Sequence, residues 1–329
     1  MTTRWQTDMA EAVRDPGELL AFLELDPRWL EPARRAAKTF PLRVPRAFLA
    51  RMQKGDPADP LLRQVLPLGE ELAETPGYVE DPVGDMPSVA ARGLLHKYRG
   101  RVLLITTGAC GVHCRYCFRR HFPYSEENAR SGEWREALDY IAADTSIDEV
   151  ILSGGDPLAL SDERLAGLAR AVEAIPHIRR LRLHTRQPVV LPSRVDGALL
   201  AWLEASRLQK VVVLHTNHAN EIDAAVREAC AKLRGAGATL LNQTVLLRGV
   251  NDSAEALAAL SEALFAAQVL PYYLNLLDPV AGAAHFDVPE PEALALMEAL
   301  RARLPGYLVP RLVREVPGAP AKMPVLPAR

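Results

Sequence analysis

The stretch Cys110-Gly-Val-His-Cys114-Arg-Tyr-Cys117-Phe-Arg-Arg-His-Phe122 holds three of the four cysteines of the chain. It follows an apolar run, Val102-Leu103-Leu104-Ile105, that is typical of a buried strand. Soft, redox-active iron–sulfur clusters take thiolates of this kind as ligands. Three thiolates leave one iron of a four-iron cluster without a protein ligand, so a small molecule can coordinate there. The loop therefore predicts one-electron chemistry.

Zinc is the alternative metal for this loop. A structural zinc site needs four ligands, and His113 or His121 could supply the fourth. The usual zinc spacing is two short ligand pairs far apart in the sequence, which favours iron and sulfide here. A disulfide framework is disfavoured, because the chain is long, its first residues lack an apolar signal-peptide core, and the cluster holds an odd number of cysteines.

Beyond residue 100, apolar runs alternate regularly with helical patterns. The predicted strands are 102–107, 148–153, 179–184, 210–215, 239–247 and 271–277. The predicted helices are 133–143, 162–174, 196–206, 219–235, 253–267 and 289–303. This alternation implies an α/β fold with a parallel sheet and right-handed crossovers. Six units are too few for an eight-fold barrel, and functional groups are expected at the carboxyl ends of the strands.

The two ends of the chain differ from this regular part. Residues 1–95 are punctuated by prolines and carry short helical patterns at 18–25 and 47–52, which predicts an N-terminal helical cap. Residues 96–303 are expected to form the regular α/β part, as a partial barrel. In the tail, 304–329, Tyr307-Leu308-Val309-Pro310 predicts a short strand, and the residues that follow are too rich in proline for a helix.

Composition limits the class of protein. The chain has 329 residues, 49% of them hydrophobic, and a formal net charge of −2, as in an ordinary globular protein. This charge gives no reason to expect a nucleic acid partner. No apolar run approaches the roughly 20 residues that span a membrane. We therefore expect a cytoplasmic protein, in a compartment that keeps thiols reduced.

The cysteine spacing, with Tyr116 before the third cysteine, resembles that of the radical S-adenosylmethionine (SAM) superfamily. The flanks His96-Lys97-Tyr98 and Arg101-Val102-Leu103-Leu104 resemble the lysine 2,3-aminomutases. This resemblance runs from Arg14-Asp15-Pro16 to Lys322, nearly the whole chain. Within the family, the chain is most similar to the short forms that prepare β-lysine for modification of elongation factor P. The implied fold is a partial (β/α)6 TIM-type barrel with an N-terminal helical extension and a C-terminal cofactor-binding tail.

The resemblance also implies a cluster site and a SAM site. The ligands of the [4Fe-4S] cluster would be Cys110, Cys114 and Cys117. The implied SAM contacts are Tyr116, Ser153, Gly154, Gly155, Asp156, His215 and Gln243. The run 153–157 follows a predicted strand, where glycine allows a backbone to approach a ligand closely. Taken alone, this run would equally suit a plain strand-to-helix turn.

A pyridoxal phosphate (PLP) site is implied at the tail. The run Lys322-Met323-Pro324-Val325-Leu326-Pro327 resembles the family motif whose lysine binds PLP covalently. Lys97, Tyr98 and Arg101 stand at family positions for binding of this cofactor and its phosphate. Without the resemblance, Lys322 would be an ordinary solvated residue of the tail.

The same resemblance implies where an amino acid substrate would bind. Arg119 would hold the α-carboxylate, since a guanidinium suits bidentate capture of a carboxylate. Asp278 and Glu315 would face the far end of the substrate, and two carboxylates favour a cationic, lysine-like side chain. Ser253 stands where longer family members carry a zinc-binding cysteine, so no structural zinc is expected. Cys230 is expected to be a core residue.

The function implied is an isomerase, a lysine 2,3-aminomutase that uses the cluster, SAM and PLP to convert L-α-lysine into β-lysine. The implied partners are lysine, an electron donor such as flavodoxin or ferredoxin, the elongation factor P ligase, and a second copy of the chain as a homo-oligomer. Three alternatives remain. They are a catabolic mutase of free lysine or another amino acid, a radical enzyme without PLP, and an iron–sulfur or zinc binding module without mutase activity.

Overall fold

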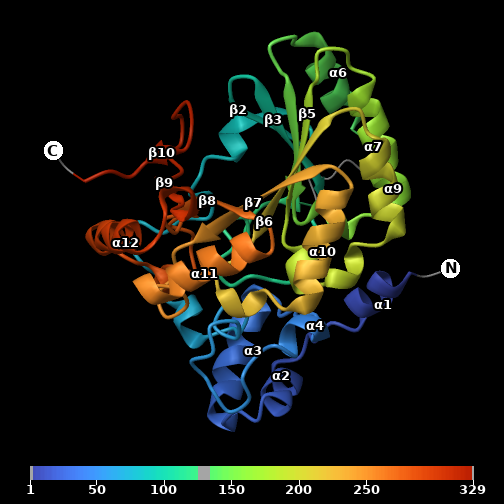
Figure 1. The fold of residues 1–329 in the computed structure, drawn as a ribbon. Coiled ribbons are helices and arrows are strands. Elements are labelled where there is room, and N and C mark those ends of the chain that lie inside the picture. Colours follow the sequence, from blue (N-terminus) through green and yellow to red (C-terminus); the bar gives the residue numbers. More distant parts are fainter. Residues whose placement is uncertain (1–2, 125–133, 328–329) are drawn as a thin grey trace.

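A computed structural model describes residues 3–124 and 134–327, which form one ten-stranded sheet in the order of the chain (Figure 1). The strands are β1 Val89–Ala91, β2 Leu94–Tyr98, β3 Arg101–Thr107, β4 Glu149–Gly154, β5 Arg180–Thr185, β6 Gln209–His215, β7 Ala238–Val245, β8 Leu270–Asn275, β9 Arg311–Arg314 and β10 Met323–Pro324. The helices are α1 Arg4–Ala10, α2 Pro16–Phe22, α3 Leu30–Thr39, α4 Arg46–Leu49, α6 Arg135–Ala143, α7 Asp162–Glu173, α8 Gln187–Val190, α9 Gly197–Ala205, α10 Ala224–Gly235, α11 Ala254–Ala266 and α12 Glu290–Arg303.

Strands β3 to β9 are parallel to one another, and antiparallel strands flank them at both edges. The six predicted strands correspond to β3 through β8, and the six predicted helices to α6, α7, α9, α10, α11 and α12. Residue 133, the predicted first residue of α6, lies outside the described residues. The α/β partial barrel expected from the sequence is therefore confirmed, and the strands direct their carboxyl ends to one side.

Local sequence explains where the crossover helices begin. The side chains of Asp196, Asp223 and Ser253 each accept a hydrogen bond from the backbone amide three residues further on, at 2.9–3.1 Å. Such N-caps satisfy amides that have no partner within the helix. Three of the six crossovers thus begin at a residue type that the sequence itself marks as a helix start.

Four short strands, β1, β2, β9 and β10, were not predicted at their observed positions. Residues 307–310, expected to be a strand, instead belong to a 3-10 turn, Gly306–Leu308, and the residues leading out of it. The strand begins after Pro310, at β9, where Leu312 and Val313 are buried. In the expected helical cap, β1 and β2 join the sheet instead. These strands are short, and their alternation is too brief to distinguish from a loop.

Two apolar cores position the site. The larger lies between β2–β7 and the helices that cover them, and it includes the buried Cys230, as expected. The second fills the N-terminal region and packs against Val112 of the cysteine loop and Val190 and Leu191 after β5. Residues 3–68 thus cover the loop that carries the cysteines (Figure 1).

Across the described ranges, no helix is both long enough and apolar enough to cross a membrane.

Candidate functional site

A cavity of about 400 Å³ inside the curved sheet brings together every residue that the sequence assigned to the site. Its lining includes Lys97, Tyr98, Arg101, Cys110, Cys114, Tyr116, Cys117, Arg119, Ser153, Gly154, Gly155, Asp156, His215, Gln243, Asp278, Glu315 and Lys322. These residues come from most of the strands and from the tail. The fold therefore gathers residues that lie more than 200 positions apart in the sequence.

The three-cysteine loop is fastened to the N-terminal region by its backbone. The amide of Arg115 donates to the carbonyl of Gln64 at 2.9 Å, and that of His113 donates to the carbonyl of Arg43 at 3.0 Å. These bonds fix the loop on both sides of its second cysteine, Cys114. The N-terminal region therefore sets the shape of the loop as well as covering it.

Both candidate fourth zinc ligands make other contacts. His113 Nδ1 lies 2.8 Å from the carbonyl oxygen of Pro41, and His121 Nε2 lies 3.2 Å from that of Ala281. Among residues 3–124 and 134–327, no three His, Cys, Asp or Glu side chains are grouped to hold a single metal ion.

A four-iron cluster has different requirements, because each thiolate binds a different iron. The thiols of Cys110, Cys114 and Cys117 are free, and all three line the cavity. Burial raises the pKa of the Cys110 thiol, and the nearby sulfurs of Cys117 and Cys114 raise it further. Three crowded sulfurs around one space are a donor set that fits such a cluster.

A buried ion triad anchors the loop. Glu71 accepts two hydrogen bonds from Arg115, at 2.8 and 2.5 Å, and one from Arg120 at 2.7 Å. All three side chains are at most 1% exposed. Two of the loop's arginines are thus used for structure, and this leaves Arg119 to face the cavity.

The glycines after β4 allow the strand to pass the cysteine loop. Gly154 has a φ of +120°, and a Cβ there would lie 2.6 Å from the carbonyl oxygen of Thr107. A Cβ on Gly155 would lie 2.4 Å from the carbonyl oxygen of Ala109. Only glycine avoids both clashes. The two glycines are thus explained by packing against the residues just before Cys110.

The carboxylate of Asp156 is hydrogen-bonded to other residues of the protein. One carboxylate oxygen accepts from the Thr185 hydroxyl at 2.7 Å and the Leu158 amide at 3.0 Å. The other accepts from the amides of Arg186 and Gln187, at 2.7 and 3.1 Å. Four donors satisfy the carboxylate, so this side chain shapes the turn after β5 in the structure described here.

Two polar residues at the carboxyl ends of β6 and β7 face each other. His215 Nε2 and Gln243 Nε2 lie 2.6 Å apart. Burial, with smaller contributions from Arg186, Lys322 and Arg119, lowers the pKa of His215 to about 3. The imidazole is therefore neutral at physiological pH, and it can accept or donate one hydrogen bond without carrying charge.

The tail brings Lys322 into the cavity. Its Nζ atom lies 2.9 Å from a Glu315 carboxylate oxygen and 3.1 Å from Asn275 Oδ1. The hydroxyl of Tyr98 donates to the other Glu315 oxygen. Glu315, expected at the far end of the substrate, is thus in contact with the lysine and the tyrosine of the expected PLP site.

Asp85 links the residues expected to bind phosphate and carboxylate. Its oxygens lie 2.6 Å from Arg119 Nε and 2.6 Å from Lys97 Nζ. Burial alone would raise the pKa of Asp85, but the two cations hold it below its usual value. The side chain of Arg101 makes no hydrogen bond or ion pair with the described residues, and its guanidinium lies 4.5 Å from the centre of the Tyr98 ring. Arg101 is therefore available to an anion.

The side chain of Asp278 places a carboxylate at the wall of the cavity. Within the part of the chain that the structure describes, its side chain accepts no hydrogen bond and forms no ion pair. Burial raises its pKa to about 6, although Lys322 nearby lowers it. A cationic group beside Asp278 would favour its charged form.

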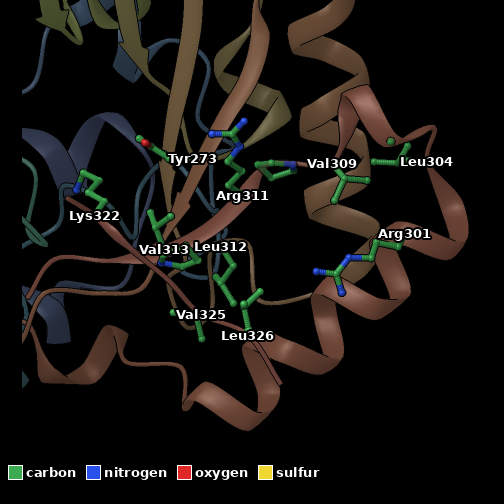
Figure 2. A pocket seen from close by; sticks show the side chains of 13 residues that line it. Tyr273, Arg301, Leu304, Val309, Arg311, Leu312, Val313, Lys322, Val325 and Leu326 are labelled. Carbon is green, nitrogen blue, oxygen red and sulfur yellow. The ribbon is translucent and has the colours of Figure 1, made fainter. Parts of the chain in front are cut away.

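Figure 2 shows a second cavity, of about 490 Å³, on the outer side of the tail. Its lining includes Arg301 of α12, Arg311 and Val313 of β9, and Leu326. Lys322 lines both cavities, as does Tyr273. The tail around β10 thus lies between the site cavity and the second cavity.

Sequence reasoning missed Asp85, Arg186 and Glu221. Arg186 follows β5 directly, and Glu221 follows β6 by six residues. Polar residues just after apolar strands could have signalled both, since ligands gather at that edge of a parallel sheet. No comparable signal marks Asp85, because it lies among loop acids that resemble surface residues.

An open parallel sheet, with a three-cysteine loop after its first parallel strand, defines a class of iron–sulfur enzymes. In agreement, residues 104–260 match the radical SAM superfamily.

Several full-length relatives narrow the class. The L-lysine 2,3-aminomutase of Escherichia coli K12 is 53% identical, over 98% of this chain and 94% of that protein. The enzyme of the same name from Haemophilus influenzae is 48% identical, over 97% and 94%. The one from Clostridium subterminale is 34% identical, over 98% and 78%. The chain therefore belongs to the L-lysine 2,3-aminomutase family, isomerases of the radical SAM superfamily, as the sequence motifs predicted.

Proposed function

We propose that this protein converts L-α-lysine into β-lysine, using a [4Fe-4S] cluster, SAM and PLP, and that the β-lysine serves the modification of elongation factor P. The observation that carries the reaction is one cavity in which three cysteines, Lys322 and an unpaired carboxylate, Asp278, face the same space. When bound, the cluster with SAM supplies a hydrogen-abstracting radical, and PLP supplies stabilisation of the migrating amino group.

The residues of the tail side would hold PLP. Lys322 is the amine that would bond to it, and Glu315 and Asn275 orient its Nζ atom in the free protein. Arg101 has an unengaged guanidinium, and Lys97 adds a second cation 2.6 Å from Asp85. Phosphate is recognised by such cationic donors. Loading of PLP would therefore require Glu315 to release Lys322 while Lys97 and Arg101 take the phosphate.

The cysteine side would hold the cluster and SAM. Cys110, Cys114 and Cys117 would ligate three irons, and the neutral His215 and Gln243 would contact the nucleoside part of SAM. Asp156 would act by shaping the β5 turn, since its oxygens are already engaged.

Two side chains of opposite charge, Arg119 and Asp278, would select the substrate. Arg119 lines the cavity, and its Nη1 donates to Ser153 Oγ at 3.2 Å, which leaves donors for an α-carboxylate. Asp278 offers an unpaired carboxylate to an ammonium group. An amino acid with a cationic side chain satisfies both charges. A glutamate substrate would place a carboxylate beside Asp278, where two like charges repel.

The destination of the product rests on the sequence. The chain is 53% identical to one relative of similar length and 34% identical to a longer one, which fits the short-form enzymes that serve elongation factor P. A low-potential donor such as flavodoxin or ferredoxin would supply electrons, and the ligase of elongation factor P would take the product. The cytoplasm, where thiols stay reduced, suits these steps.

The test is an anaerobic assay of the full chain reconstituted with iron and sulfide. The protein receives PLP, SAM, dithionite and lysine, and β-lysine is measured by mass spectrometry after derivatisation. We expect β-lysine only when both SAM and PLP are present. Deoxyadenosine without β-lysine would contradict lysine as the substrate. If a protein with a verified cluster forms neither product, the proposal that it is a radical enzyme is contradicted. Adding elongation factor P and its ligase tests the destination: unmodified factor in the presence of β-lysine would contradict it.

A further inference from the structure

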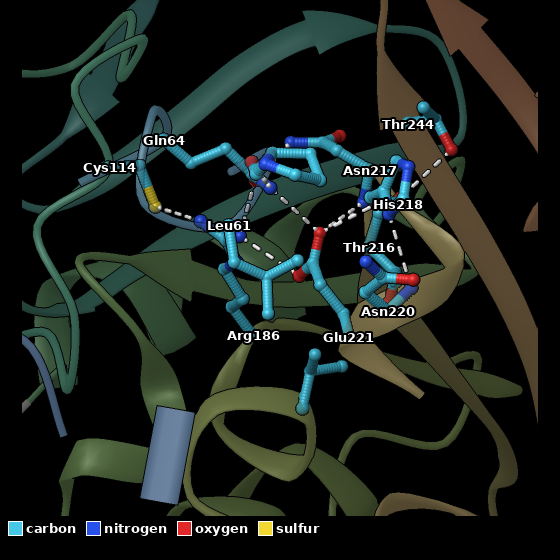
Figure 3. A network of polar contacts seen from close by, with 12 residues as sticks. Leu61, Gln64, Cys114, Arg186, Thr216, Asn217, His218, Asn220, Glu221 and Thr244 are labelled. Carbon is cyan, nitrogen blue, oxygen red and sulfur yellow. Dashed lines mark hydrogen bonds and ion pairs between the residues drawn. The ribbon is translucent and has the colours of Figure 1, made fainter. Parts of the chain in front are cut away.

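A buried arginine donates a hydrogen bond to one of the three cysteines. Arg186 follows β5 directly, its side chain is 5% exposed, and its Nη1 lies 2.8 Å from the sulfur of Cys114 (Figure 3). A guanidinium cannot lose its proton in a protein, so the contact brings a permanent positive charge to this sulfur. The roles proposed above for SAM, PLP and lysine do not use this arginine.

The guanidinium is held by two partners on its other side. Its Nη2 donates to Gln64 Oε1 at 2.6 Å and to Glu221 Oε2 at 3.0 Å. Glu221 is fully buried, and its second oxygen accepts from the backbone amides of Asn217 and His218, at 2.8 and 3.1 Å. Gln64 also accepts from Asn217 Nδ2 at 2.9 Å. Figure 3 shows Gln64 and Glu221 beside the guanidinium, and Asn217 and His218 on the far side of the Glu221 carboxylate.

Aromatic rings and the backbone restrict Arg186 further. Its guanidinium carbon lies 5.3 Å from the centre of the Phe48 ring and 5.7 Å from that of Tyr116. Its backbone amide donates to Asp156 at 2.7 Å. The side chain is therefore fixed before any metal binds, and a fixed donor loses little entropy when it bonds to a thiolate.

The charge of this donor matters most for reduction of a cluster. Adding one electron turns one ferric iron into ferrous iron and makes the cluster with its three thiolates more negative by one charge. Hydrogen bonds to the sulfurs are among the factors that set the reduction potential. A cationic donor stabilises the more negative state, and a buried carboxylate nearby destabilises it, because the low-dielectric interior screens charge weakly.

We propose that Arg186 and Glu221 form a buried charge pair that sets the reduction potential of the cluster through Cys114. This inference rests on the proposed assignment of the three cysteines as cluster ligands. Arg186 is a positioning residue, since it acts through Cys114. It raises the potential, so that a one-electron donor of the flavodoxin or ferredoxin class can reduce the cluster. Glu221 limits this rise and holds the guanidinium in place.

The test is a reductive titration of the anaerobically reconstituted full chain, followed by electron paramagnetic resonance and compared at equal iron and sulfide content. Arg186→Gln should lower the midpoint potential by at least a tenfold change in the reduction equilibrium, which is 59 mV for one electron. Glu221→Gln should move it in the opposite direction. A purely structural role predicts no such opposite shifts.

A matched control comes from Arg194, another fully buried arginine, which within the described residues contacts neither a cysteine nor Arg186 or Glu221. Its Nε donates to the carbonyl of Leu158 at 2.7 Å, and its Nη2 donates to Asp162 Oδ1 at 2.8 Å. Arg194→Gln, compared at equal iron content, should therefore leave the midpoint potential within about 15 mV of the wild type, less than a twofold change in the equilibrium.

The outcomes separate this inference from the proposed function. An unchanged midpoint in Arg186→Gln with full iron content, or a lowered midpoint in Glu221→Gln, overturns the inference. If Arg186→Gln does not retain iron, the direction of the shift in Glu221→Gln decides alone. A wild-type protein that takes up no cluster would overturn the proposed function instead.

Discussion

The two sides of the cavity are built differently. On the cysteine side, the functional residues rest on fully buried polar groups, such as Glu71 with its two arginines and Glu221 with Arg186. On the tail side, Lys322 is 26% exposed and follows a turn into a two-residue strand, with a second cavity behind it. Buried charge networks resist rearrangement, whereas a partly exposed pair can exchange partners with little cost.

This difference matches what the two proposed groups, the iron–sulfur cluster and PLP, require of the protein. A cluster must keep its ligands and its electrostatic surroundings while its charge changes. An amine that bonds to PLP must be released and recaptured in each turnover, so it needs freedom to move. The cysteine side should therefore fail as a unit when it is altered, and the tail side should lose chemistry while keeping its fold.

The largest expected effect is on the cysteine side. Cys114→Ala removes a proposed cluster ligand and the acceptor of Arg186, so cluster-dependent turnover should fall by at least about 1,000-fold. The measurement is deoxyadenosine and β-lysine formation, together with the iron content. Cys230→Ala, in the apolar core, is the control and should keep its iron. Full turnover in Cys114→Ala would contradict the cluster assignment.

Glu71→Gln tests the stability of the same side. It leaves Arg115 and Arg120 buried without a counter-charge, which should lower the free energy of unfolding by about 3–5 kcal/mol. Denaturant unfolding of the iron-free protein measures this loss. Glu18→Gln removes the partner of Arg46 in an exposed ion pair, and it should cost less than about 1 kcal/mol. Equal losses in the two variants would remove the contrast between buried and exposed pairs.

Asp278→Asn should separate function from stability. Loss of the carboxylate should lower kcat/KM for lysine about 10- to 100-fold, measured with both cofactors loaded. The pKa of Asp278 is raised to about 6 in the folded protein. Above that pH the carboxylate is charged in both states, and its charge costs more in the folded protein than in the unfolded chain. The variant should therefore unfold about 1–3 kcal/mol less readily than the wild type at pH 7.5.

The sign of this stability difference depends on pH. As the pH falls from about 6 to 4, the folded wild type takes up a proton on Asp278 before the unfolded chain does, so the wild type gains stability. The advantage of Asp278→Asn should then disappear near pH 4. An unchanged kcat/KM would remove Asp278 from the substrate site, and an advantage that persists at pH 4 would contradict the pKa argument.

The smallest expected effect on stability is on the tail side. Lys322→Ala should change the free energy of unfolding of the PLP-free protein by less than about 1 kcal/mol, because Glu315 keeps the Tyr98 hydroxyl and Lys97, 3.8 Å away, as partners. It should nevertheless abolish the absorbance of the protein–PLP adduct. A loss as large as that of Glu71→Gln would show that the tail is as rigidly anchored as the cysteine loop.

The sequence predicted the regular part of the fold well, because β3–β8 and their helices carry long apolar patterns with clear periods. It failed where the strands are short, at β1, β2, β9 and β10, because their apolar alternation is too brief to distinguish from a loop. In the site, Cys114 could be named from the cysteine spacing and Lys322 only from the resemblance to a family motif, and the structure brings both into one cavity.

The supporting residues could not be predicted in the same way. Asp85, Gln64 and Glu221 each bind an arginine that lies more than 30 positions away, and no local spacing encodes such contacts. The contact of Glu315 with Lys322 was unexpected for a different reason: the two residues are close in the sequence, but they meet only because the tail folds back to pair with β9. Chemistry concentrated in one loop is readable from the sequence, whereas the network that holds the loop needs the fold.

The central claim is that SAM, bound at the cluster, and PLP act on one substrate in one cavity. The most direct measurement uses lysine deuterated at the β-carbon and follows deuterium into the deoxyadenosyl group by mass spectrometry. The account predicts deuterium transfer in the wild type with PLP present, and none in Lys322→Ala or without PLP. A wild-type protein with verified cluster and PLP that cleaves SAM without any deuterium transfer would contradict it.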